Sequence, residues 1–289
     1  MPAYRFCRPD DIPLLVAAVN ECYDVHYPDR PPLTLDKFRE EMKEIDLWPS
    51  NCMVAMAGDD PIAVLIGTKR TDEAFLLRLG VRSDYQRQGH GLHLLTSLSQ
   101  KLSVLGPPRL IAEVPHDEPG VLELAAAAGY EAEVTFTDYL RPANAPAIDE
   151  VPAELVLPAT VDDLIDAELL TGLDSRPGGG VAWERTAPVL QARAGVLQGW
   201  AIGTPMGLDA YLLAHLDGDD ARVVGFGARD QAWSEALPGL LLRSLISTTK
   251  GSVRLSRLVD GELPADLLRE LGFEAVGRFT RYGREATPA

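Results

Sequence analysis

An internal repeat constrains the fold of this chain more than any other feature. Residues 129–141 align with residues 272–284 at an offset of 143, and seven of the thirteen aligned positions are identical. Two further landmarks, a helix start and a strand, fall at offsets of 152 and 147: Asp10 with Asp162, and residues 74–82 with residues 221–229. Such drift is what loop insertions and deletions produce. The sequence therefore predicts two copies of one α/β unit.

The length supports this division, because 289 residues exceed the usual size of one domain. Residues 141–152 contain three prolines and little hydrophobic periodicity, which is typical of a linker. We expect a first domain at residues 1–143, a linker at 144–152 and a second domain at 153–289. A single large domain with a surface crossover at this place is the alternative.

A glycine-containing loop lies between a predicted strand and a predicted helix in the first half. The strand is residues 74–81, and the helix that follows carries leucines at 95, 98, 102 and 105, on one face. A helix N-terminus directs unpaired N–H groups at one point, and glycines let a diphosphate come close. The loop therefore predicts a phosphate site, although glycines at such a junction can also simply form a turn. Its members are Gln86, Arg87, Gln88, Gly89, His90 and Gly91.

The spacing of these glycines and the bulk composition exclude several classes of protein. The loop fits neither GxxxxGK[ST] nor GxGxxG, which argues against a P-loop nucleotidase and a dinucleotide-binding domain. A net charge of −16 disfavours nucleic-acid binding. Three cysteines without a CxxC pair disfavour a disulfide framework and a metal site. No apolar run reaches membrane-spanning length and no signal segment is present, so we expect a cytoplasmic protein without membrane contact.

The first half resembles the GCN5-related N-acetyltransferase (GNAT) superfamily. The resemblance rests on Leu79-Gly80-Val81, on Gln86-x-x-Gly89-x-Gly91 and on the closing Gly129-Tyr130 turn, and it extends over residues 4–141 in element order. It implies an α/β fold of two tandem GNAT-type domains, each with a mixed, mostly antiparallel central sheet flanked by helices. The two-copy layout is similar to that of mycothiol synthase.

The second copy has lost the glycines of the loop. Ala236 and Pro238 stand opposite Gly89 and Gly91 when the offset of 147 is applied. Both carry a Cβ and proline has no N–H, so this copy is predicted to keep the fold without the ligand site. We expect it to act as a scaffold, as one wall of the acceptor site or as an oligomer surface. In the last case the chain would form a homodimer.

The resemblance implies acetyl-CoA as the acyl donor and no metal. Residues 86–91 would bind the CoA diphosphate, and the main chain of Leu79 and Val81 would pair with the pantetheine arm. Asp117 stands where many members have an asparagine near the cofactor. An amine of a small molecule or peptide would then attack the thioester directly. The alternative is a non-catalytic acyl-CoA sensor or an interaction protein that uses this fold.

Three side chains are candidates for proton transfer. Glu113 lies on the strand expected beside the thioester, and Glu73 begins the strand that leads into the loop. Tyr139 lies on the closing strand and is matched by Tyr282 in the repeat, as a structural residue would also be. Glu113 could equally face solvent. Ala125 occupies the position of the tyrosine that many members use as a general acid, which favours the non-catalytic alternative.

Overall fold

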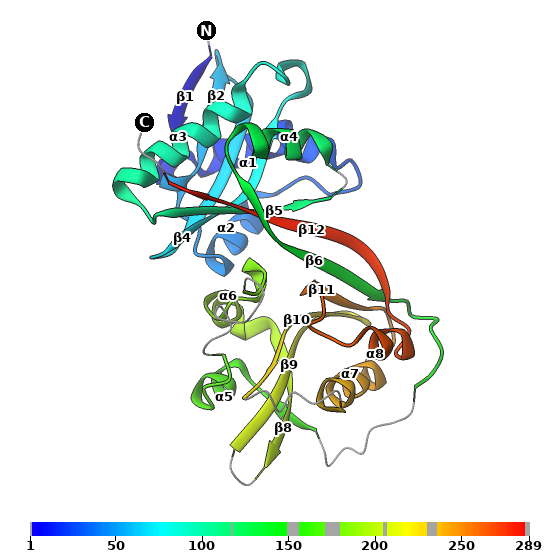
Figure 1. Cartoon of the computed structure of the whole chain (residues 1–289). Coiled ribbons are helices and arrows are strands. Elements are labelled where there is room, and N and C mark those ends of the chain that lie inside the picture. Colours follow the sequence, from blue (N-terminus) through cyan, green and yellow to red (C-terminus); the bar gives the residue numbers. More distant parts are fainter. Residues whose placement is uncertain are drawn as a thin grey trace. The chain divides into compact units, whose positions relative to one another are not determined.

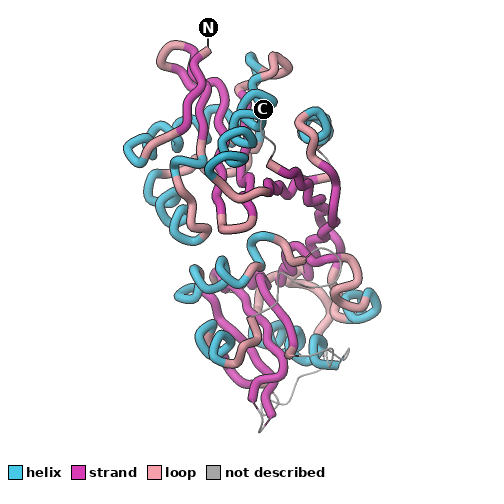
Figure 2. Tube along the Cα trace, turned by 60° about the vertical axis from the view of Figure 1, so that its left-hand side comes forward, coloured by secondary structure: helices cyan, strands magenta, loops and turns pink. Residues whose placement is uncertain are grey.

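The computed structural model is an α/β structure that forms two compact units (Figure 1). It describes residues 2–116, 118–148, 156–170, 180–204, 207–229 and 236–286. Unit 1 consists of Met1–Glu133 together with Thr280–Ala289, and unit 2 consists of Val134–Phe279. In each unit helices lie on both sides of the strands (Figure 2). The expected fold class, a mixed and mostly antiparallel sheet flanked by helices, is confirmed.

The sheet of unit 1 contains a run of antiparallel strands followed by one parallel pair. Strands β1 to β4 each pair antiparallel with the next, and β4 pairs parallel with β5. Strand β12 follows β5 in the sheet order. The bounds are Ala3–Phe6 (β1), Met53–Ala57 (β2), Asp60–Lys69 (β3), Glu73–Val81 (β4), Arg109–Pro115 (β5) and Glu274–Glu285 (β12).

Both faces of this sheet are covered because its strand residues alternate between two cores. Val64 and Ile66 of β3 pack with Leu15 beneath α1 (Ile12–Cys22) and α2 (Leu35–Glu44). Leu65, between them, packs with Leu94 on the opposite face, beneath α3 (His90–Leu105) and α4 (Pro119–Ala127). The two helical layers therefore cover opposite faces of the sheet at β3.

Unit 2 repeats this plan. Its sheet order is β6-β11-β10-β9-β8-β7, with β10 and β11 as the parallel pair and the other pairs antiparallel. The strands are Glu131–Arg141 (β6), Leu157–Ala159 (β7), Leu197–Thr204 (β8), Gly207–Asp217 (β9), Asp220–Ala228 (β10) and Val253–Val259 (β11). The helices are Val161–Asp166 (α5), Ala187–Ala192 (α6), Ala236–Thr248 (α7) and Ala265–Glu270 (α8).

Short 3-10 helices of three residues complete the two units. They lie at Pro9–Asp11, Asp24–His26, Pro49–Asn51, Ser83–Tyr85, Trp183–Arg185 and Ala194–Val196. No helix among the described residues is long and apolar enough to span a membrane.

The closing strands of the two repeats are exchanged between the units. Strand β6 belongs to unit 2 from Val134 onward, and β12 belongs to unit 1 from Thr280 onward; they are the green and red strands in Figure 1. In unit 2, Arg141 Nε donates to the Leu271 carbonyl at 2.9 Å. In unit 1, Arg284 donates to the Ala128 carbonyl. Both arginines and both carbonyls are related by the offset of 143, so each strand makes its contacts in the other unit.

This exchange divides the chain differently from the ranges 1–143 and 153–289 expected from the sequence. A repeat shows which segments are alike, and it does not show which unit each segment joins. The unit bounds instead fall within β6 and β12, at Val134 and Thr280. Part of the expected linker, residues 149–152, lies outside the described residues, as do the first three residues of the expected second domain, 153–155.

Ion pairs of opposite polarity hold the exchanged strands. In unit 1, Arg281 of β12 pairs with Glu113 of β5 at 2.9 Å, and both side chains are almost fully buried. In unit 2, the residue equivalent to Arg281 is Asp138 of β6, whose carboxylate accepts from the Arg257 backbone N–H at 2.8 Å and contacts Arg254 at 3.4 Å. In unit 1 the exchanged strand β12 thus carries the guanidinium, whereas in unit 2 the exchanged strand β6 carries the carboxylate.

Candidate active site

The predicted phosphate loop has a backbone that glycine makes accessible. Arg87 and Gly89 have positive φ angles of 60° and 88°, and Gly89 caps the N-terminus of α3. The N–H groups of Gly89, His90 and Gly91 have no acceptor among the described residues. A Cβ on Gly91 would lie 3.1 Å from Leu124 Cδ2, so a larger residue there would require the Leu124 side chain to shift. These features are those that close approach of a diphosphate requires.

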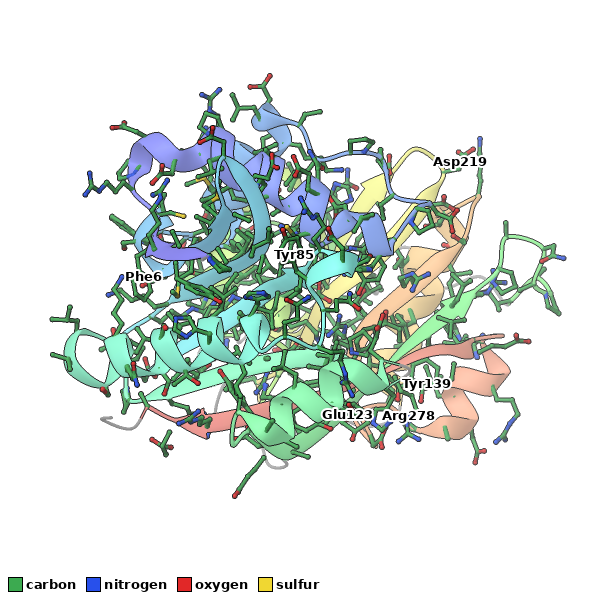
Figure 3. The ribbon with its side chains drawn as sticks, turned by 90° about the horizontal axis from the view of Figure 1, so that it is seen from above. Phe6, Tyr85, Glu123, Tyr139, Asp219 and Arg278 are labelled. Atoms are coloured by element: carbon green, nitrogen blue, oxygen red, sulfur yellow. The ribbon has the colours of Figure 1, made fainter. Side chains whose placement is uncertain are left out.

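A groove of about 720 Å³ opens against this loop and gathers most of the residues predicted to bind the cofactor. Arg87 is exposed there and donates to Glu123, which stands on α4 (Figure 3), at 2.6 Å. Gln88 is not among the lining residues, and its amide donates to the Asp84 carbonyl at 3.0 Å. Asp117 lies outside the described residues. The predicted residues that line the groove are Leu79, Val81, Gln86, Arg87, Gly89, His90 and Gly91.

The groove continues to a place where β4 and β5 separate. Their parallel pairing runs from Glu73–Arg109 to Leu76–Ala112 and goes no further, although β4 extends to Val81 and β5 to Pro115. A β-bulge at Leu77 disturbs the pairing of β4 with β3 at the same point, since Ile66 is opposite Arg78 and Gly67 is opposite Leu76. A bulge bends its strand. The main chain of Leu79 and Val81 therefore lies beyond the last β4–β5 pair.

Side chains of the groove already bind part of this main chain. The Val81 carbonyl accepts from Gln86 Nε2 at 3.2 Å and from His26 Nε2 at 3.1 Å. His90 has a different environment, since it is buried and its Nδ1 lies 2.6 Å from the Tyr4 hydroxyl oxygen. His26 and Gln86 thus hold the end of β4 against the loop, whereas His90 fixes the start of α3 to β1.

A second cavity, which we call the cleft, adjoins the groove where the strands separate. It has a volume of about 100 Å³ and shares with the groove the walls formed by Tyr27, Leu79, Glu118 and Leu124. Its lining includes polar side chains from three strands and from the segments between elements. They are Arg78 of β4, Glu113 of β5 and Tyr282 of β12, and Tyr23, Tyr27, Glu118 and Tyr130 outside the strands. All lining residues belong to unit 1.

Two tyrosines of the cleft are held protonated by burial. Desolvation raises the pKa of Tyr130 to about 12, and its buried hydroxyl has no hydrogen-bond partner among the described residues. Burial also raises the pKa of Tyr27, whose hydroxyl donates to Glu118 Oε1 at 3.3 Å. Ala125 forms part of the same wall. The cleft therefore offers neutral hydroxyl donors and one carboxylate, Glu118, that reaches both cavities.

The three candidates for proton transfer lie in three different environments. Glu113 lines the cleft, with its carboxylate bound by Arg281. Glu73 lies at the start of β4, where burial raises its pKa and Arg109 Nε is 3.7 Å away, and it lines neither the groove nor the cleft. Tyr139 belongs to unit 2 and packs against the hydrophobic core of that unit. Tyr282, its counterpart in the repeat, packs against the core of unit 1 and also lines the cleft.

Two residues of the site, Tyr27 and Glu118, carry no motif in the sequence, and the fold brings them together. Tyr130 belongs to the closing Gly129-Tyr130 turn, and its hydroxyl group in the cleft is an addition from the structure. The alignment of Tyr139 with Tyr282 was a usable signal, but it did not indicate the exchange of strands. Among the described residues no group of three or more His, Cys, Asp or Glu side chains could hold a metal ion.

Comparison with known proteins agrees with this geometry. Residues 16–130 match the model of the Acetyltransferase (GNAT) family. The fold is that of the GNAT acetyltransferases. No curated protein sequence matches the chain.

Solved structures with the GNAT fold resemble the whole chain. A GCN5-related N-acetyltransferase from Sphaerobacter thermophilus is 16% identical with a TM-score of 0.70, covering 100% of this chain and 96% of that one. A tandem GNAT protein from the clavulanic acid biosynthesis pathway is 16% identical with a TM-score of 0.64, covering 100% of both chains. A putative acetyltransferase from Pyrococcus horikoshii is 14% identical with a TM-score of 0.63, covering 99% and 90%. Because the identities are only 14–16%, these structures show a similarity of fold and nothing further.

Proposed function

We propose that unit 1 is an acetyl-CoA-dependent N-acyltransferase that passes an acyl group directly to an amine of a small molecule or peptide. The observation that carries this proposal is one continuous path. The glycine loop at the N-terminus of α3 opens into a groove, and the groove leads to the cleft where β4 and β5 separate. The family model over residues 16–130 supports acyl transfer in general.

The loop is suited to the diphosphate of CoA. The N–H groups of Gly89, His90 and Gly91 and the dipole of α3 favour a negative charge. The Arg87 guanidinium adds a cation at the surface, where Glu123 holds it. The pantetheine arm would then follow the main chain of Leu79 and Val81 along the edge that β5 leaves. The thioester end would then lie at the cleft.

In the reaction the amine nitrogen bonds to the thioester carbon, the carbon–sulfur bond breaks, and the thiolate takes up a proton while the amine gives one away. Catalysis of this kind depends on positioning and on hydrogen bonds to developing charge. The cleft holds carboxylates and protonated phenols for the two proton transfers. Glu118 is better placed as the base than Glu113, because Arg281 already binds the Glu113 carboxylate.

A second candidate function is a sensor that binds acyl-CoA without turnover. One observation favours it, namely that the wall of the cleft carries the small side chain of Ala125 where the resemblance places a catalytic tyrosine. Buried hydroxyl groups in the same cleft, such as that of Tyr130, favour the enzyme.

For unit 2 we propose a scaffold with a degenerate loop. Its helix α7 begins at Ala236 and carries Pro238, which has no N–H, in the first turn. The residues before it, 230–235, lie outside the described residues. A layout like that of mycothiol synthase, a cytoplasmic location and a homodimer formed through unit 2 belong to the same proposal. The net charge of −16 suits cationic amine acceptors.

Titration calorimetry with acetyl-CoA tests the proposal. Gly91→Pro and Gly91→Ala both add a Cβ beside Leu124, but only Gly91→Pro removes the N–H donor at the second position of α3, where proline is tolerated in a helix. Loss of one hydrogen bond to a charged group, about 1.5–3 kcal/mol, weakens binding roughly 10–150-fold. Asp266→Pro is the matched control, because it places proline at the same position of α8 in unit 2.

We expect binding of one acetyl-CoA to the unaltered chain and to the control. Release of CoA with a panel of primary amines then separates the enzyme from the sensor, since a sensor binds acetyl-CoA without amine-dependent turnover. Absence of acetyl-CoA binding to a folded, unaltered chain refutes both functions.

A further inference from the structure

The strand exchange brings a tyrosine from the end of the second repeat into the cleft of unit 1. Tyr282 lines the cleft together with Glu113, Ala125 and Tyr130. We propose that Tyr282 is a substrate-contacting residue of unit 1 and lies against the acyl end of the bound thioester. This inference rests on the proposed function and adds to it a residue outside the part of the chain that the family model matches, residues 16–130.

Contacts on both sides of Tyr282 fix its position. Arg281 is bound to Glu113 at 2.9 Å, and Thr280 Oγ1 lies 2.7 Å from His116 Nε2. Arg284 donates to the Ala128 carbonyl at the end of α4. A Cβ on Gly283 would collide with the Glu133 carboxylate. The backbone that carries Tyr282 is therefore held to β5, to α4 and to the turn after α4.

The position of Tyr282 assigns it to the acyl end of the donor and not to the diphosphate end. Tyr282 lines the cleft and is absent from the lining of the groove, which contains the glycine loop. The two cavities meet at Leu79, whose main chain lies beyond the last β4–β5 pair. A donor with its diphosphate at Gly89 and Gly91 thus extends through the groove before it reaches Tyr282.

Tyr139 provides a matched comparison within the same chain. It is the same residue type at the equivalent position of the repeat and lies opposite Leu255 in the sheet of unit 2. Each tyrosine packs against the core of its own unit, and Tyr282 also lines the cleft. A role in the cleft therefore concerns Tyr282 and not Tyr139, whereas a structural role in the sheet would be common to both tyrosines.

Affinity labelling of the full chain tests this assignment. In a Tyr282→Cys variant, chloroacetyl-CoA places an electrophilic carbon at the cleft. The thiolate attacks that carbon, a carbon–sulfur bond forms, chloride leaves, and the thiol proton passes to solvent. The three native cysteines give a low background, because all are buried and desolvation raises the pKa of each to about 12: Cys7, Cys22 and Cys52.

We expect the Tyr282→Cys variant to be labelled at least tenfold faster than a Tyr139→Cys variant, and free CoA to suppress the difference. Equal labelling of two folded variants that bind acetyl-CoA overturns the role of Tyr282 and leaves the proposed function intact. Absence of acetyl-CoA binding by the unaltered chain is a different result and removes the proposed function first.

The unaltered chain provides a second test that needs no folded variant. Nitration of tyrosine with tetranitromethane, read by peptide mass, should fall at Tyr282 when acetyl-CoA is bound and should stay constant at Tyr139. Unchanged nitration of Tyr282 in a chain saturated with acetyl-CoA contradicts the proposal.

Discussion

The buried ion pair between Glu113 and Arg281 gives the sharpest prediction about the exchanged strands. Both side chains are less than one-tenth exposed, and Arg281 Nη2 lies 2.9 Å from Glu113 Oε1. Arg281→Met keeps much of the side-chain length and leaves the Glu113 carboxylate buried without this cation. Removing one partner of a buried pair costs about 3–5 kcal/mol. For a unit of this size, about 3 °C per kcal/mol, the melting temperature of unit 1 falls by roughly 10–15 °C.

The assay must report each unit by itself, because unfolding of two units need not be one transition. Pulsed hydrogen exchange during urea unfolding, read on peptides from β5 and β11, separates unit 1 from unit 2. We expect the β5 peptide to lose protection at lower urea and the β11 peptide to lose it later. The matched control is Arg269→Met, since the pair of Arg269 with Asp266 is exposed and is worth less than about 1 kcal/mol.

A double variant separates the charge effect from the loss of packing. Glu113→Gln combined with Arg281→Met removes both charges, so its unit 1 should be more stable than that of Arg281→Met alone. The reasoning is refuted if Arg281→Met changes the β5 midpoint no more than Arg269→Met does. It is also refuted if the double variant is as unstable as the sum of its two single variants.

Three further predictions concern other parts of unit 1. Gly80→Ala should destabilise it by about 1–3 kcal/mol or more, because the new Cβ would collide with the Cys22 carbonyl oxygen. Urea unfolding of this variant beside Gly120→Ala, whose Cβ would have no atom within 4 Å, checks the cause. Hydrogen bonding to Arg5 holds the pKa of Asp11 at about 2, below its ordinary value of 3.8. The lowered pKa adds to the free energy of unfolding above pH 3.8, and this contribution is lost as the pH falls toward 2. It amounts to no more than about 1 kcal/mol, because the pair is partly exposed, and Asp11→Asn should remove this part of the pH dependence. At pH 8 the native thiols should react with iodoacetamide far more slowly than an unfolded control, as peptide mass spectrometry would show, and one fast-reacting cysteine would contradict their burial.

Much of the fold and the loop of the site could be predicted from local patterns. The strand predicted at residues 74–81 is β4 at Glu73–Val81, and the leucine face after the glycines belongs to α3. Both patterns repeat within a few residues, so the signal is local. The unpaired N–H groups at Gly89 follow from the same local geometry, because a helix that starts after glycine exposes them.

The exchange of the closing strands could not be predicted, since it depends on contacts between distant residues. Tyr139 and Tyr282 lie in similar sequence segments, as do Arg141 and Arg284. The residue after the tyrosine differs, Leu140 or Gly283, and so does the residue before it, Asp138 or Arg281. The charge of this preceding residue meets a different partner on β11 or β5. An unexchanged arrangement would place Asp138 beside Glu113 and Arg281 beside Arg254 or Arg257. The information was present in the sequence, but only the fold shows which partner each charge has.

The exchange also has a consequence for the order in which the protein can mature during translation. Unit 1 is composed of its first 133 residues and of a segment that begins at residue 280, about 150 residues later. At about 5–20 residues per second the ribosome needs roughly 7–30 s to cover that distance. Throughout this interval Glu113 is without Arg281 and the wall of the cleft that Tyr282 forms is missing. A nascent chain can therefore assemble the glycine loop early, but its cleft is complete only after unit 2 has been synthesised.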